Sequence, residues 1–278
     1  MKPVELRLGD LRIEGWSRAG DATWFRVHPP GLAFDVGRGA TQLAGAADVF
    51  LSHGHLDHSL GLPYVLSQRS LHQSAHTRVF CPAEVVEPLA ALLAAAERLE
   101  NAVYRYDLVP LQPGDRVEVG RHLAIEAFAT DHVVPSLGFH LIRSKRRLAA
   151  RFAGLSGPEL AELRQRGEET SEAVEELWLS YCGDTGPAIF DMEPRLFESR
   201  VLMLECTFLG DEHHDKGQLY KHMTWNDIAR RAGELRNQDL VLHHLSRRYK
   251  VRDLRAEIDP LLPGLVPCVH ILVEGEVV

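Results

Sequence analysis

Residues 51–58, which read Leu-Ser-His-Gly-His-Leu-Asp-His, place three imidazoles and a carboxylate within six positions. Neutral imidazole and carboxylate are ligands that suit zinc. In a regular helix or strand these side chains would point to different faces, so we expect a turn between a strand and a helix, with Gly54 giving the backbone its freedom. A histidine-rich surface loop is the alternative, but this density after an apolar strand favours a metal site. The candidate ligands are His53, His55, Asp57 and His58.

One such loop cannot complete two metal shells, so further ligands should follow later strands. Taken alone, a polar residue at a strand end is more often a cap or a satisfied core group. Together, three later motifs follow predicted strands in a consistent order, which favours a two-metal site. They are Thr130-Asp131-His132, Gly183-Asp184-Thr185 and His243-His244.

The order of these motifs, H-x-H-x-D-H, then His, then G-D-T, then His, resembles that of metallo-β-lactamase-fold hydrolases. Within this fold, the chain is similar to ribonuclease Z, the endonuclease family that trims the 3′ ends of precursor tRNA. The likeness extends from about residue 15 to residue 249 and looks nearest to the short plant and bacterial form. The segments that carry it are 33–37, 132–139, 205–209, 222–224 and 244–249.

The resemblance implies a zinc-dependent phosphodiesterase with two Zn²⁺ per chain, Mn²⁺ being the alternative ion. A metal-bound hydroxide would attack the phosphorus, and two cations would steady the attacking and leaving oxygens. The implied ligands are His53, His55 and His132 for one ion, Asp57, His58 and His244 for the other, and Asp184 as the bridge.

Two residues are implied to move protons, and two to support ligands. Asp57 would take a proton from the attacking water, and His222 would protonate the departing ribose 3′-oxygen, since imidazole titrates near neutral pH. A helix-capping or core histidine is the alternative for His222. Asp35 and Glu205 are expected to accept hydrogen bonds from ligand imidazoles, because a metal-bound histidine usually donates its other N–H.

Two halves rich in strands, each followed by helices, predict an α/β (α+β) fold: a four-layer αββα metallo-β-lactamase sandwich with a short inserted arm. The density of short strands in the first fifty residues predicts a largely antiparallel sheet there. Thr224 and Asp227 form a capping-box pattern, which predicts a helix over residues 224–237. We expect one domain over residues 1–278.

The inserted arm is expected at residues 143–176, with a short helix over residues 158–166. From the residues alone, its basic start is more simply a solvated charge run. The resemblance instead implies an exosite that grips tRNA, since phosphate contacts position RNA without reading its sequence. The basic residues are Arg143, Lys145, Arg146, Arg147 and Arg151.

The amino-acid composition limits the kinds of partner that the protein can bind. The formal charge of −8 argues against binding nucleic acid by bulk electrostatics, so any contact with RNA must be local. Four scattered cysteines indicate a reducing compartment, and we expect a cytoplasmic protein with no signal peptide, no membrane span and no membrane partner. The resemblance implies precursor tRNA as the partner and a homodimer as the assembly.

Three other functions are known for sites of this kind. A small-molecule hydrolase of the same superfamily, acting on a cyclic phosphodiester, lactone or thioester, remains open, because a metal site does not name its substrate. Di-iron oxidoreductases of this fold carry a carboxylate where this chain has His55, so that class is disfavoured. A non-catalytic nucleic-acid-binding relative is disfavoured because every expected ligand is present. The basic arm is the feature that favours RNA over a small substrate.

Overall fold

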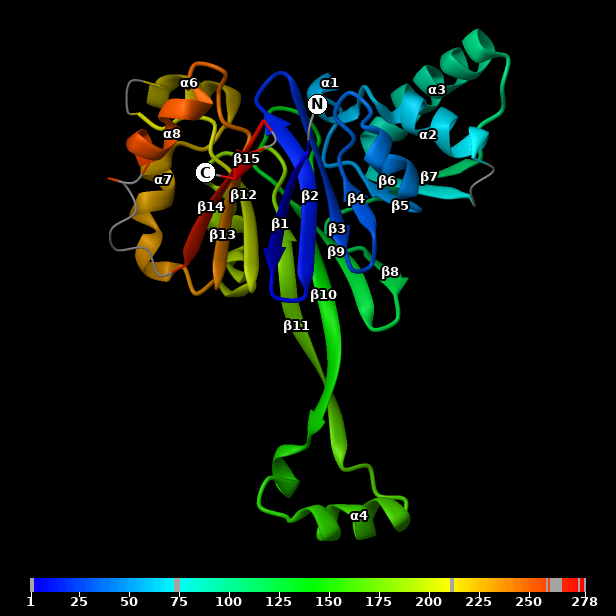
Figure 1. Ribbon diagram of the computed structural model, residues 1–278, viewed down its shortest axis with the longest axis vertical. Helices are drawn as coiled ribbons and strands as arrows, with labels where there is room; N and C mark the ends of the chain where they lie inside the picture. The colour runs from blue at the N-terminus through cyan, green and yellow to red at the C-terminus, as the bar shows by residue number, and fades with distance from the viewer. Residues whose placement is uncertain are drawn as a thin grey trace.

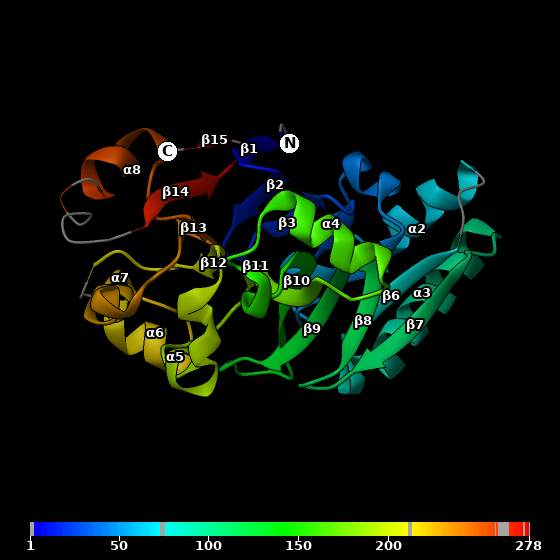
Figure 2. The same cartoon turned by 90° about the horizontal axis from the view of Figure 1, so that it is seen from below.

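Short strands with alternating buried residues open the chain and build one edge of a sheet. The computed structural model describes residues 3–72, 76–210, 213–258, 260, 267–274 and 276–277. Two β-sheets pack face to face with helices on both outer sides, so the predicted four-layer αββα class is confirmed (Figures 1 and 2).

The first sheet contains seven strands in chain order. Its neighbours are antiparallel from β1 to β4 and parallel from β4 to β7. The expectation of a largely antiparallel sheet in the first fifty residues is therefore confirmed, and beyond them helical crossovers after β5 and β6 return the chain in the same direction. The strands are β1 Val4–Leu8, β2 Leu11–Arg18, β3 Ala22–His28, β4 Leu32–Phe34, β5 Asp48–Phe50, β6 Thr77–Pro82 and β7 Tyr106–Leu111.

The second sheet contains eight strands in the order β15-β14-β13-β12-β11-β10-β9-β8. The strands from β11 to β14 run parallel, so their carboxyl ends lie at one edge of the sheet, where ligands commonly bind in such sheets. The strands are β8 Arg116–Gly120, β9 Leu123–Ala129, β10 Leu137–Leu148, β11 Ser171–Tyr181, β12 Val201–Glu205, β13 Asp239–His243, β14 Cys268–Val273 and β15 Glu276–Val277.

Helices cover both outer faces, except for α4, which lies at the tip of the arm (Figure 1). Trp24 and Leu93 are buried in the cluster between the first sheet and its helices, and Trp225 and Leu254 in the cluster between the second sheet and its helices. The helices are α1 Leu56–Ser59, α2 Leu62–Leu71, α3 Val86–Glu100, α4 Gly157–Gln165, α5 Ile189–Met192, α6 His214–Tyr220, α7 Trp225–Arg230 and α8 Val251–Ile258. None of these described helices has the length and the apolar composition needed to cross a bilayer.

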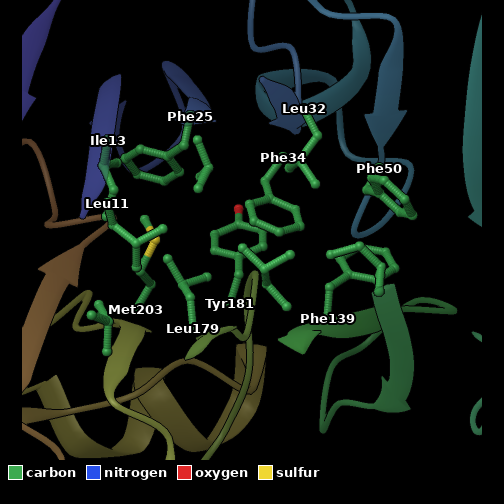
Figure 3. Packing of buried hydrophobic residues seen from close by; sticks show 14 of the residues in the cluster. Leu11, Ile13, Phe25, Leu32, Phe34, Phe50, Phe139, Leu179, Tyr181 and Met203 are labelled. Atoms are coloured by element: carbon green, nitrogen blue, oxygen red, sulfur yellow. The ribbon is translucent and has the colours of Figure 1, made fainter. Parts of the chain in front are cut away.

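The core between the two sheets contains a group of packed aromatic rings among aliphatic side chains (Figure 3). Phe34 of β4 is fully buried, and its ring stacks on Tyr181 of β11 at 4.9 Å and on Phe139 of β10 at 5.8 Å between centroids. These contacts fix the first sheet against the second. They also fix the strand ends from which the metal-binding loops emerge.

The arm is a long hairpin rather than an irregular insertion (Figure 1). β10 extends to Leu148 and β11 begins at Ser171, so both strands run well into the segment expected as the arm. Opposite charges face each other across the hairpin, which stabilises strands that have no hydrophobic alternation. At the tip, Ser156 and Glu159 form a capping box that opens α4.

The helix predicted over residues 224–237 is shorter than expected. The capping box of Thr224 and Asp227 is confirmed, but α7 ends at Arg230 and a 3₁₀ turn, Ala232–Glu234, follows. Gly233 disfavours helix, and the turn brings Leu235 into the core under the second group of helices.

Candidate metal centre

The loop after β5 carries the first ligand cluster. The chain leaves β5 at Phe50, and α1 begins at Leu56, so the predicted turn between a strand and a helix is confirmed. His53 pairs with Ser136 in an isolated β-bridge, which ties this loop to the one preceding β10. The loop is therefore held from both sheets.

Gly54 does not provide the backbone freedom that was expected of it at this turn. Its φ does not lie in the left-handed region, and a Cβ there would make only ordinary contacts with Val85. The special conformations occur at Asp35, with φ of 54°, and at His244, with φ of 60°. Gly183 also has a positive φ, and a Cβ there would lie 2.7 Å from the Cβ of Ser52. The conformational freedom that the site needs is therefore in the loops after β4, β11 and β13.

The structure brings all seven predicted metal ligands together in two neighbouring clusters. Within each cluster the candidate ligand atoms lie within 4.8 Å of one another. One cluster contains His53, His55, His132 and Asp184, and the other contains Asp57, His58 and His244.

Asp184 lies between the two clusters. Its Oδ1 is 3.3 Å from Nε2 of His58, and its Oδ2 is 3.4 Å from Nε2 of His244 and 3.7 Å from Nε2 of His53. The carboxylate is almost fully buried. One buried carboxylate thus faces imidazoles of both clusters.

Two ligand imidazoles are connected to the carboxylate of Asp35. Nδ1 of His58 donates directly to Asp35 at 2.8 Å. Nδ1 of His53 donates to Oγ of Ser52 at 2.9 Å, and that hydroxyl donates to Asp35. The phenol of Tyr181 also donates to Asp35, at 2.5 Å. These bonds leave Nε2 of both histidines directed at the cluster.

Glu205 is connected in the same way to two other imidazoles, those of His244 and His222. Nδ1 of His244 donates to Oγ1 of Thr207 at 3.1 Å, and that hydroxyl donates to Glu205 at 2.6 Å. Nδ1 of His222 lies 2.7 Å from Oε1 of the same carboxylate. Each buried carboxylate therefore orients one imidazole directly and a second one through a hydroxyl.

Several buried polar atoms of the clusters have no hydrogen-bond partner and suit a cation. Within the described residues, His53 Nε2, His58 Nε2 and Asp184 Oδ1 are buried without a hydrogen-bond partner. Nε2 of His132 and Nδ1 of His55 also converge, at 3.3 Å from each other. Unsatisfied buried groups are costly, and ring nitrogens that converge in this way are typical of shared metal ligation. The donor set therefore suits divalent cations.

The protonation states agree with this interpretation. Burial lowers the pKa of His53, His55 and His132, which keeps these rings in the neutral form that binds metal. For His58, burial also opposes the charged form, but the charges of Asp184 and Asp35 raise its pKa well above the usual range. A proton on His58 thus compensates two buried carboxylates, which is what a cation would do.

The two residues expected to move protons border the clusters. Oδ2 of Asp57 lies 3.5 Å from Nε2 of His244 and accepts a hydrogen bond from the backbone of Gly20 at 2.9 Å. Burial opposes the charge of Asp57, but its bond to His244 and the charge of His58 outweigh burial and lower its pKa. Burial also opposes a charged His222, but the charge of Glu205 and their hydrogen bond raise its pKa to about 9.

The basic residues of the arm are not free cations. The segment 143–176 contains seven Lys or Arg and seven Asp or Glu residues, so its net charge is zero. Each member of the basic run contacts an acidic residue or an aromatic ring: Arg143 contacts Glu176, Asp10 and the ring of Trp178, Lys145 contacts Glu176, Arg146 contacts Glu169, Arg147 contacts Glu172, and Arg151 contacts the ring of Phe152.

Sequence reasoning missed the residues that hold the ligands in place. Ser52 and Thr207 carry the relaying hydroxyls, and Tyr181 braces Asp35 from a strand 146 positions away. Ser52 directly precedes a ligand, which is a usable signal. Nothing in the sequence indicates that Tyr181 contacts Asp35.

The chain is similar to known proteins over most of its length. The model of a family described as the beta-lactamase superfamily domain matches residues 23–245. The tRNase Z TRZ1 of Arabidopsis thaliana is 29% identical over 277 residues, which cover 99% of each chain. The ribonuclease Z of Kineococcus radiotolerans is 30% identical over 252 residues, which cover 81% of this chain and 78% of the relative.

Solved structures show the same fold. Human tRNase Z, short form, superposes with a TM-score of 0.59 at 21% identity, covering 89% of this chain and 94% of that one. The metallo-beta-lactamase fold protein YhfI of Bacillus subtilis superposes with a TM-score of 0.64 at 17% identity, covering 96% and 98%. The two-sheet architecture is therefore that of the metallo-β-lactamase fold.

Proposed function

Because the chain belongs to the ribonuclease Z family of the beta-lactamase superfamily, we propose that it is a metal-dependent endoribonuclease that removes 3′ trailers from precursor tRNA. The observation that carries the proposal is the pair of ligand clusters that share Asp184. The donor set is imidazole and carboxylate, and it lies in a chain that matches tRNase Z TRZ1 nearly end to end.

We propose two Zn²⁺ per chain, held as the clusters suggest. His53, His55 and His132 would bind one ion, Asp57, His58 and His244 would bind the other, and Asp184 would contact both. Bound divalent cations act as Lewis acids and lower the pKa of a bound water molecule to near neutral pH. Asp35 and Glu205 keep the ligand imidazoles oriented through the bonds described above.

The chain itself supplies the proton transfers in this proposal. Asp57 is unprotonated and lies beside the clusters, and the family resemblance assigns it the proton of the attacking water. His222, held by Glu205 and protonated at neutral pH, can donate a proton to the leaving 3′-oxygen. A hollow of about 360 Å³ next to the clusters has His55 in its wall and otherwise mainly apolar residues, including Val85, Leu89 and Pro135. Such walls suit the face of a nucleobase.

We also propose that residues 1–278 act as one domain and that the arm over residues 143–176 is a tRNA-binding exosite. Arg146 and Arg147 are well exposed and are the best placed to exchange a glutamate for a phosphate. Arg143 is less suited, because it lies against Trp178. α4 has no buried residue and lies at the far end of the molecule from α1, the helix that contains Asp57 and His58 (Figure 1). This supports a homodimer in which the arm serves the partner's site.

The decisive experiment is incubation of the purified chain with a 3′-extended precursor tRNA, with and without a chelator. We expect a single cut after the discriminator base that leaves a 3′-hydroxyl on the tRNA, and no cut after chelation. A sample that hydrolyses a small phosphodiester but leaves precursor tRNA intact would instead support a small-molecule hydrolase. The scattered cysteines, three of them buried and none in a disulfide, support a cytoplasmic location.

A further inference from the structure

Three potential metal ligands meet at the edge of the second sheet opposite the catalytic clusters. Asp239 begins β13, and Cys268 and His270 lie at the start of β14. One ligand atom from each lies within 4.8 Å of the other two, and Nε2 of His270 is 2.9 Å from Oδ1 of Asp239. These strands begin at the edge away from α1 (Figure 1). At about 3.3 Å per residue, the group is roughly 16 Å from His244 at the other end of β13.

The strand register places the three side chains on one face. Asp239 pairs with Cys268 in the parallel ladder, and His270 follows Cys268 by two positions. Residues two apart in a strand share a face. Val269, between them, packs against the core under the outer helices, whereas Val241 and Leu272 belong to the core between the sheets. The trio therefore lies on the inner face, at its margin.

A group of three polar side chains on an inner sheet face is unusual, because such positions normally carry apolar side chains. The side chains of Asp239 and His270 are 17% and 19% exposed, while Cys268 is exposed, so the group is half enclosed and still reachable from solvent. The Asp–His ion pair accounts for two members. It does not account for a thiol directed at the same point.

We propose that Asp239, Cys268 and His270 form a further metal site that binds Zn²⁺ or a similar thiophilic divalent cation. Thiolate, imidazole and carboxylate are the three side-chain ligand types of zinc, and with bonds of 2.0–2.3 Å the ligand atoms of a tetrahedral site lie roughly 3.5 Å apart. Nε2 of His270 and Oδ1 of Asp239, now 2.9 Å apart, would separate to that value once an ion replaces their hydrogen bond, and the thiol lies within 4.8 Å of both. Water completes the fourth position. The ion would link β13 to β14.

The thiolate gives this site a signature that the catalytic centre lacks. Among the described residues, the catalytic clusters contain histidine and carboxylate side chains and no cysteine. Cys81, Cys182 and Cys206 are buried. Substituting Co²⁺ therefore produces a thiolate-to-metal charge-transfer band in the near ultraviolet only if Cys268 binds the ion. This test does not depend on the proposed nuclease activity.

The experiment compares the wild-type chain with Cys268→Ser and His270→Ala. Each is loaded with excess Zn²⁺, desalted and assayed for bound metal, and each is titrated with Co²⁺. We expect the wild type to bind one more ion than either variant and to show the band, which both variants lose. Val269→Thr, on the same strand but facing the other way, should keep both. Cleavage of precursor tRNA should be unchanged in Cys268→Ser.

Two results would overturn the proposal. Equal metal content in the wild type and Cys268→Ser, with no charge-transfer band in either, would leave only an Asp–His ion pair and a free thiol. A band that persists in Cys268→Ser would place the thiolate ligand elsewhere. Thermal unfolding of each variant without added metal identifies any variant that has lost its fold. Asp239→Asn, which keeps the hydrogen bond to His270, then replaces the unfolded variant in the comparison.

Discussion

Nδ1 of His222 lies 2.7 Å from Oε1 of Glu205, a fully buried carboxylate that also accepts hydrogen bonds from the backbone of Thr185 and Thr207. These backbone bonds keep Glu205 in place, so its charge acts on His222 at a fixed distance. This explains why His222 can stay protonated at neutral pH although it is largely buried.

This geometry predicts the pH dependence of tRNA cleavage. Glu205 raises the pKa of His222 to about 9, so a step that needs protonated His222 should fail only at alkaline pH. In Glu205→Gln the pKa should fall, and the alkaline limb of kcat/KM should move to lower pH by about one to three units. Bound cations lower the pKa of His222 in both proteins, so this pKa stays higher in the wild type than in Glu205→Gln.

The control for this prediction is an activated phosphodiester with a nitrophenolate leaving group, which needs no proton. Its hydrolysis by Glu205→Gln and by His222→Ala should show no such shift, while His222→Ala should lose about 10²- to 10⁴-fold in kcat on precursor tRNA. Superimposable pH profiles of wild type and Glu205→Gln on tRNA would remove His222 from the role of general acid.

The ion pairs of the arm predict opposite effects for opposite substitutions. Replacing Arg146 and Arg147 by Ala should weaken tRNA binding and lower the slope of log K against log salt by roughly two, about one per lost phosphate contact. Replacing their partners Glu169 and Glu172 by Gln should free the arginines and strengthen binding. Binding is measured by filter retention at several salt concentrations. If the two double variants change affinity in the same direction, the arm contributes structure rather than charge.

The aromatic core predicts a large loss of stability from one substitution. Phe34 is fully buried between Tyr181 and Phe139, so Phe34→Ala should lower the free energy of unfolding by about 3–5 kcal/mol. Leu99→Ala, at a side chain that is 88% exposed, should change it by less than about 0.5 kcal/mol. Denaturant unfolding measures both. Similar values for the two variants would contradict the packing seen in Figure 3.

The ligand residues could be predicted from the sequence because each follows a strand within one short motif. The order of those motifs is a local property, and the fold brings the strand ends to one edge. The buried acceptors were only partly predictable. Asp35 and Glu205 were expected, but their hydrogen bonds run through Ser52 and Thr207, and Tyr181 reaches Asp35 from another sheet. Contacts between distant segments leave no periodic pattern in the sequence.

The arm could not be predicted in its true form for a different reason. Its strands do not alternate apolar and polar residues, because both faces of the outer hairpin meet solvent. What holds them is charge pairing across the ladder, such as Arg143 opposite Glu176 and Arg147 opposite Glu172. A basic run followed by an acidic run was visible in the sequence, but the pairing of the two runs was not inferred. The arm therefore has no net charge, although its sequence begins with a basic run.

Asp184 is the residue on which both clusters depend, so its removal gives the sharpest test of the metal centre. Its two oxygens face His58, His244 and His53 at 3.3–3.7 Å, and no other described carboxylate has that position. Asp184→Ala should lose at least one of two bound ions and reduce tRNA cleavage to background, because the imidazoles then lack the anion that joins them. Metal content by elemental analysis and cleavage are measured on the same sample. Asp131→Asn, in a neighbouring loop and paired with Lys221, should keep both ions. A metal content of Asp184→Ala equal to that of the wild type would show that the clusters bind metal independently of the shared carboxylate.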